Sequence, residues 1–141
     1  MVVRSLDVNK DPFRPRESDE ELLGPEVPYL SAIGALMYLV NHTRPDITFV
    51  VNLLARYSFA PTRRHWNGIK HILRHLRDTM DMGLFYSKVS NYDLVGYVDA
   101  GYLSDPYNGR SQTGYLFLCG GTAISWRSMK QTTTATSSNH A

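Results

Sequence analysis

The sequence is poor in cysteine and has no long apolar run. Its 141 residues include one cysteine, Cys119, so an internal disulfide is excluded and stability must come from packing. No apolar stretch approaches the roughly 18 residues that a membrane span needs. The amino terminus also lacks the apolar segment of a secretory signal. A transmembrane protein is therefore excluded, and we expect no membrane partner.

Charge is distributed unevenly along the chain. The formal net charge is only +2, but acidic residues are in excess in residues 1–28 and basic residues in residues 29–90, whereas residues 91–141 are balanced. The acidic stretch contains four prolines and no apolar periodicity, which is typical of an extended or disordered leader. We therefore divide the chain into a leader, 1–28, a helical segment, 29–90, and a strand-rich segment, 91–141.

Three stretches of the helical segment have apolar residues at helical spacing. They are Leu30, Ile33, Met37 and Val40; Ile47, Val50, Val51 and Leu54; and Trp66, Ile69, Leu73 and Leu76. Thr43 is the expected cap of the second helix, with Pro45 in its first turn, and Thr62 is the expected cap of the third. The pattern predicts three short amphipathic helices.

Beyond these helices the apolar period falls toward two, and valine, tyrosine and phenylalanine dominate. The predicted strands are 93–99, 113–119 and 123–128. Gly120 and Gly121 suit the tight turn of a hairpin between the last two strands. The final residues, "TATSSNHA", are typical of a helix start. Helices followed by antiparallel strands predict an α+β fold.

Several long motifs, in order, resemble the Pol polyprotein of copia-type LTR retrotransposons. They read "YLSAIGALMYLVNHTRPDITFVVNLLARYS", "PTRRHWNGIKHILRHLR" and "GYVDAGYLSDPYNGRSQTGYLFLCGGTAISWRSMKQTTTATSSNHA". The matching region of that family follows the reverse-transcriptase palm and runs into ribonuclease H. The resemblance covers about residues 29–141 and implies a thumb-like helical segment followed by a truncated ribonuclease H-like three-stranded antiparallel sheet.

Asp99 carries the chemistry that this resemblance implies. Ribonucleases H hold two Mg²⁺ ions with four carboxylates, and Asp99, at the tip of the first predicted strand, corresponds to the first of them. The family's next carboxylate is a glutamate directly after "SSNHA", where this chain ends at Ala141. Asp105, in a predicted loop, does not replace it. We therefore expect no ribonuclease H activity, no bound Mg²⁺ cofactor, and no effect of Asp99→Asn.

The third predicted helix carries a basic stripe. Arg63, Lys70, Arg74 and Arg77 lie within about 60° of one another at 100° per residue. In the family this helix resembles a thumb element near template and primer, which implies weak, salt-dependent binding of RNA or DNA. The alternative is a solvated helix face without a ligand.

The spacing of the histidines and of the aromatic residues indicates structural roles for both. His71 and His75 are four residues apart, with His65 a little under two turns earlier, but no motif supplies a convincing further ligand, so we predict no metal site. The aromatic residues at regular spacing are expected to pack in the core rather than stack on bases. They are Trp66, Tyr97, Tyr115, Phe117 and Trp126.

Arg74, His75, Leu76 and Arg77 spell "RHLR", the RxLR tetrapeptide of oomycete effectors. It lies within a predicted helix, where Leu76 is needed for the core, which argues against a translocation signal. The whole chain nevertheless resembles secreted RxLR effectors of downy-mildew oomycetes. That resemblance implies secretion, entry into a plant host cell, an unidentified host protein as partner, and interference with host cell death or immunity. The alternative is an intracellular retrotransposon remnant, inert or weakly binding nucleic acid.

A sheet of three strands without covering helices exposes an apolar face or an unpaired edge. We therefore expect marginal stability or self-association through the exposed sheet edge.

Overall fold

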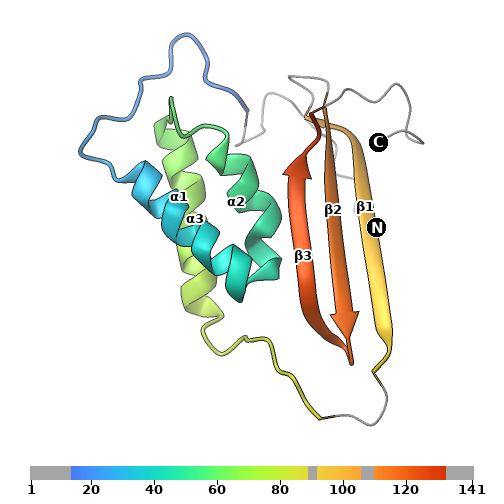
Figure 1. Ribbon diagram of the computed structural model, residues 1–141. Coiled ribbons are helices and arrows are strands. Elements are labelled where there is room, and N and C mark those ends of the chain that lie inside the picture. The colour runs from blue at the N-terminus through green and yellow to red at the C-terminus, as the bar shows by residue number, and fades with distance from the viewer. Residues whose placement is uncertain (1–13, 89–91, 106–109, 133–141) are drawn as a thin grey trace.

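The computed structural model describes residues 14–88, 92–105 and 110–132 and has three helices followed by a three-stranded antiparallel sheet (Figure 1). The elements are α1 (Tyr29–His42), a 3-10 turn η1 (Pro45–Ile47), α2 (Thr48–Ala55), α3 (Arg63–Asp78), β1 (Leu94–Asp105), β2 (Arg110–Cys119) and β3 (Thr122–Lys130). The α+β fold class is thus confirmed, while the likeness to ribonuclease H rests on the sequence. None of the described helices is long and apolar enough to cross a membrane.

The apolar core lies among the helices. Val51, Leu54 and Ile69 are inaccessible to solvent at its centre. The predicted stripes were wrong at two positions, because Leu30 is 67% and Leu73 48% exposed. Tyr29 and Ile72, the residues immediately before these two, are buried instead. Apolar residues at helical spacing can be drawn along more than one side of each helix. Tertiary packing decides which of these sides faces the core.

The connection from α1 to α2 differs from its prediction. Thr43 follows the last residue of α1 and does not cap the next helix. Pro45 occupies the first turn of η1, as expected, and α2 continues directly from that turn. At α3, Thr62 is confirmed as the N-cap, in a capping box whose second side chain is His65.

The sheet has the order β1-β2-β3, and Gly120 and Gly121 form its β2–β3 turn as predicted. Their φ values of 56° and 82° suit a type I′ turn, which needs positive φ at both central residues. The first strand is longer than predicted. Its pairing with β2 continues beyond Asp99 to Asp105, so the prediction of a loop at Asp105 was wrong.

Helices and sheet meet along β3, which lies beside α2, whereas β1 is the strand farthest from the helices (Figure 1). The indole Nε1 of Trp126 donates to the Val40 carbonyl at 2.6 Å. Arg56 donates to the side chain of the buried Gln112. These polar contacts fix β2 and β3 against the helical core, while β1 lies farther away.

The described part of the predicted leader lies against the start of α3. The Leu23 amide donates to the Pro61 carbonyl at 2.9 Å, and Leu22 forms an isolated antiparallel bridge with Thr62. Apart from this bridge, residues 14–28 contain turns and irregular backbone, and the interpretation of residues 1–28 as an extended or disordered leader stays a prediction. The helix start predicted in the tail lies outside the described residues.

Candidate functional site

The basic stripe lies on the surface of α3. Arg63, Lys70, Arg74 and Arg77 are all exposed. Within the part of the chain that the structure describes, Arg77 alone of the four has an acidic partner, Asp78, at 3.0 Å. An exposed pair of this kind is weak and easily exchanged for a phosphate contact. The stripe therefore presents four cations to solvent along one line of the helix.

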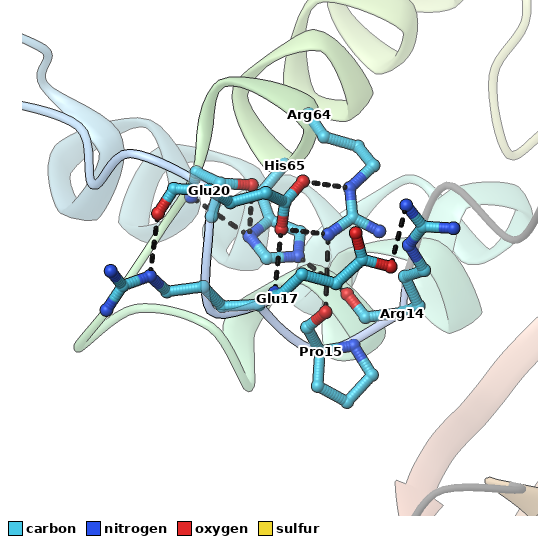
Figure 2. Close-up of polar contacts among 8 residues, drawn as sticks. Arg14, Pro15, Glu17, Glu20, Arg64 and His65 are labelled. Atoms are coloured by element: carbon cyan, nitrogen blue, oxygen red, sulfur yellow. Dashed lines mark hydrogen bonds and ion pairs between the residues drawn. The ribbon is translucent and has the colours of Figure 1, made fainter. Parts of the chain in front are cut away.

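The neighbouring Arg64 does not belong to this line, because its guanidinium is paired with Glu20 of the leader. Its Nε lies 3.0 Å from Glu20 Oε1, and its Nη2 donates to the Pro15 carbonyl at 3.3 Å (Figure 2). Burial acts to raise the pKa of Glu20. Hydrogen bonds from the Glu17 amide and Arg64 have a larger, opposite effect, and the pKa of Glu20 is therefore below its ordinary value. The ion pair attaches the leader to α3.

His65 is a structural residue with no solvent exposure. Its Nδ1 accepts from the Thr62 amide at 3.1 Å, and its Nε2 donates to the Arg14 carbonyl at 3.1 Å (Figure 2). The ring stacks on Tyr57 with centroids 4.1 Å apart. Burial lowers the pKa of His65, and the neutral Nε2–H tautomer satisfies both hydrogen bonds. Both ring nitrogens are thus occupied by the chain itself.

Sequence reasoning missed a partly buried polar network between η1 and the end of α3, centred on Arg44. Arg44, only 8% exposed, binds Asp46 twice, with Nε to Oδ1 at 2.9 Å and Nη2 to Oδ2 at 2.7 Å. The same Nη2 donates to Thr79 Oγ1 at 2.7 Å, and His75 Nε2 lies 2.8 Å from Asp46 Oδ2. The Arg44 guanidinium holds the pKa of Asp46 at about 2. The sequence signal for this network was the presence of opposite charges, Arg44 and Asp46, on the two sides of Pro45.

The RHLR tetrapeptide belongs to the last turns of α3. Leu76 packs against the core, as the sequence indicated, and His75 is engaged by Asp46. Arg74 and Arg77 are exposed, because they lie on the opposite side of the helix from the core. Recognition of all four residues as an extended peptide would require the end of α3 to unfold.

Asp99 lies in the middle of β1, opposite Gly114 of β2, rather than at a strand tip. It lines a cleft of about 670 Å³ between the sheet and the η1–α2 segment, together with Asp46, Phe49, Tyr97 and Trp126. Asp46 is already bound through both carboxylate oxygens. Over the described ranges, no three acidic, histidine or cysteine residues are grouped so as to hold a metal. This donor set does not fit Mg²⁺, which needs a near-octahedral oxygen shell.

Two of the five predicted core aromatics are instead exposed, and Tyr115 is intermediate. Tyr97 is 57% and Phe117 37% exposed, so their core prediction was wrong. Trp66 packs against the helical core, and Trp126 is half-buried where β3 meets α1. Tyr97 is on β1, the strand farthest from the helices. Phe117 pairs with Ser125, the neighbour of Trp126, so it lies on the face of the sheet opposite to the one that contacts the helices.

Comparison with known proteins yields a secreted effector protein and several Pol polyproteins that match most of the chain. The chain is 46% identical over 112 residues to the secreted RxLR effector protein 161 of Plasmopara viticola, covering 79% of each. It is 44% identical over 116 residues to the retrovirus-related Pol polyprotein from transposon TNT 1-94 of Nicotiana tabacum, and 40% over 113 residues to that from transposon RE2 of Arabidopsis thaliana. The chain belongs to the copia-type Pol family.

Copia-type Pol proteins are much longer than this chain. The matches cover 82% and 80% of the chain but only 9% and 8% of the two polyproteins. No family model and no solved structure matches the chain. The chain is therefore a Pol-derived segment, and the activities of a whole Pol polyprotein do not transfer to it by similarity alone.

Proposed function

We propose that this Pol-derived segment binds RNA or DNA through the basic stripe on α3. The observation that carries the proposal is the exposed row of four cations along one line of the helix. Lysine and arginine side chains contribute to nucleic-acid affinity chiefly by neutralising phosphates and releasing counterions. The arrangement contains no base-reading element, so binding is expected to be independent of nucleotide sequence.

The stripe has a definite length and charge. Fourteen helical steps separate Arg63 from Arg77, which at about 1.5 Å per residue is about 21 Å. If all four cations contact phosphates, the logarithm of the association constant should fall with the logarithm of salt concentration. The slope should be about −3.6 on duplex DNA and about −2.8 on a single strand.

Replacing all four stripe residues with glutamine is expected to abolish this salt dependence and to weaken binding at least tenfold at low salt. Fluorescence anisotropy with a labelled oligonucleotide, titrated at several salt concentrations, measures both quantities. A matched control replaces Lys88 and Arg127 with glutamine, since both are exposed basic residues outside α3. If the four-residue variant retains the wild-type slope, the stripe is not the binding surface.

We further infer that the segment does not cleave nucleic acid by itself. The inference is supported by the position of Asp99 across a cleft from a carboxylate that Arg44 already occupies. A purified chain incubated with a labelled RNA–DNA hybrid and Mg²⁺ should leave it intact, and Asp99→Asn should behave identically. Cleavage that disappears in Asp99→Asn would contradict the inference and restore the ribonuclease H interpretation.

A second candidate function is that of a secreted effector, favoured by the match to the Plasmopara viticola protein over most of both chains. In this role the segment enters a plant host cell, binds a host protein and interferes with cell death or immunity. Expression of the chain inside leaf cells challenged with a cell-death elicitor tests it. Altered cell death that persists in the glutamine variant of the stripe would separate this role from nucleic-acid binding.

A further inference from the structure

The outer edge of β1 has no strand partner in the described parts of the chain. Its inner edge pairs with β2 from Leu94 to Gly101, and the register then shifts before Asp105 pairs with Arg110. Figure 1 shows β1 on the side of the sheet away from the helices. A strand in this position presents unpaired amide and carbonyl groups along its free edge.

Residues 94–101 lack most of the devices that protect natural edges. Proteins commonly place proline, lysine, inward-pointing charge or a bulge on an exposed strand. Within this stretch Asp99 is the single charged residue, and proline is absent. The irregular register begins only after Gly101. Among the residues that the structure places, a regular and nearly uncharged edge of eight residues is therefore left without a partner strand.

The side chains along this edge are also exposed and apolar. Leu94 is 66%, Tyr97 57% and Val98 74% exposed. Leu94 and Val98 lie on one face of the sheet, and Tyr97 and Asp99 on the other, because successive side chains alternate. Pairing along the edge would bury part of the side chains on both faces of the sheet. This would add apolar contact to the main-chain hydrogen bonds.

We propose that this edge pairs with the same edge of a second copy, in antiparallel orientation about a two-fold axis, to form a continuous six-stranded sheet. Such an interface is self-complementary, since each residue's contact is repeated by symmetry. Charge disfavours one register, and we propose the neighbouring one. An axis at Asp99 would oppose two carboxylates, whereas an axis at Val98 pairs the two valines and places Tyr97 opposite Asp99.

The expected complex is a reversible dimer. Stable interfaces bury about 1,200–2,000 Å² in total, and an eight-residue edge contact is at the low end of this scale or below it. The mass measured by light scattering or sedimentation should therefore rise from monomer to dimer as the concentration of the full chain increases. A chain that stays monomeric up to about millimolar concentration, near the weak end of specific affinities, would overturn the proposal.

A charge placed on the edge should abolish the dimer. Val98→Lys opposes two ammonium groups across the two-fold axis, so this variant is expected to remain monomeric with an unchanged circular dichroism spectrum. Ile124→Lys is the matched control, because Ile124 is a 47% exposed aliphatic residue of β3, away from the β1 edge. Equal loss of association in both variants, or its loss in neither, would show that the β1 edge is not the interface.

Cross-linking tests the register. In a Cys119→Ser background, Val98→Cys should form a covalent dimer on mild oxidation, because directly opposed residues of antiparallel strands lie about 4.5–5.5 Å apart at Cα. Ile124→Cys should not. A dimer that fails to cross-link at position 98 would contradict the proposed pairing. The salt dependence of nucleic-acid binding should be the same in Val98→Lys as in the wild type. Failure of the dimer proposal can therefore be distinguished from failure of the nucleic-acid proposal.

Discussion

Arg44→Ala is expected to lower the free energy of unfolding by about 2 kcal/mol, because it removes a buried guanidinium from a partly buried ion pair and its hydrogen bonds. The guanidinium donates to both oxygens of Asp46 and to the hydroxyl and carbonyl of Thr79. It thereby joins η1 to the residue that follows α3. Chemical denaturation at pH 7, followed by circular dichroism, measures the change.

Two variants make this test specific. Arg44→Lys retains the charge but not the planar fork, so it should recover only part of the lost stability. Arg63→Ala removes an exposed arginine from the first turn of α3 and should change stability by about 0.5 kcal/mol or less. A loss below about 1 kcal/mol in Arg44→Ala would show that the network contributes little to folding.

The same network predicts a dependence on acid pH. The folded pKa of Asp46 is about 2, against an ordinary value of 3.8. A lowered carboxyl pKa contributes stability that is present above 3.8 and is lost as the pH falls toward 2. At about 1.4 kcal/mol per pKa unit this shift corresponds to at most about 2.5 kcal/mol, because solvent screens a carboxylate that is 31% exposed. This part of the acid sensitivity should be much reduced in Arg44→Ala.

Features encoded by neighbouring residues could be predicted from the sequence. The Thr62 cap, the glycine pair between β2 and β3 and the order of helices and strands follow from local spacing and backbone preference. Each depends on residues a few positions apart, which the sequence displays directly. The basic stripe belongs to the same class, since a helix and its residue spacing suffice to align the four cations.

Features that depend on distant partners could not be predicted in this way. Asp46 and His75 are 29 residues apart, and His65 and Arg14 are 51 residues apart. Nothing near His65 distinguishes a buried cap from a solvated histidine. Tyr97 alternates like a core residue, yet it is exposed because its strand lies beyond the reach of the described helices. Sequence periodicity predicts which residues share a face, whereas tertiary packing decides which faces are covered.

His65→Phe is expected to lower the free energy of unfolding by about 2 kcal/mol at pH 7.5. Phenylalanine preserves a flat ring that can stack on Tyr57, but it removes the acceptor for the Thr62 amide and the donor to the Arg14 carbonyl. The variant retains the Thr62 N-cap but loses the return hydrogen bond of the capping box, and two buried backbone groups are left unpaired at about 1 kcal/mol each. Urea unfolding curves of the wild type and the variant give the difference.

The pH dependence of that difference distinguishes a neutral buried histidine from a charged one. Burial lowers the folded pKa of His65 below its ordinary value of 6.5. Stability from the neutral ring is therefore complete above 6.5 and declines as the pH falls from 6.5 toward the lowered folded value. The wild type should thus lose more stability than His65→Phe between pH 7.5 and 5, so the two curves of stability against pH converge.

His71→Gln, at an exposed position, should follow the wild type in parallel. Curves for His65→Phe that diverge from the wild type toward acid pH would mean that the ring is protonated in the fold, because a charged His65 would gain stability as the pH falls.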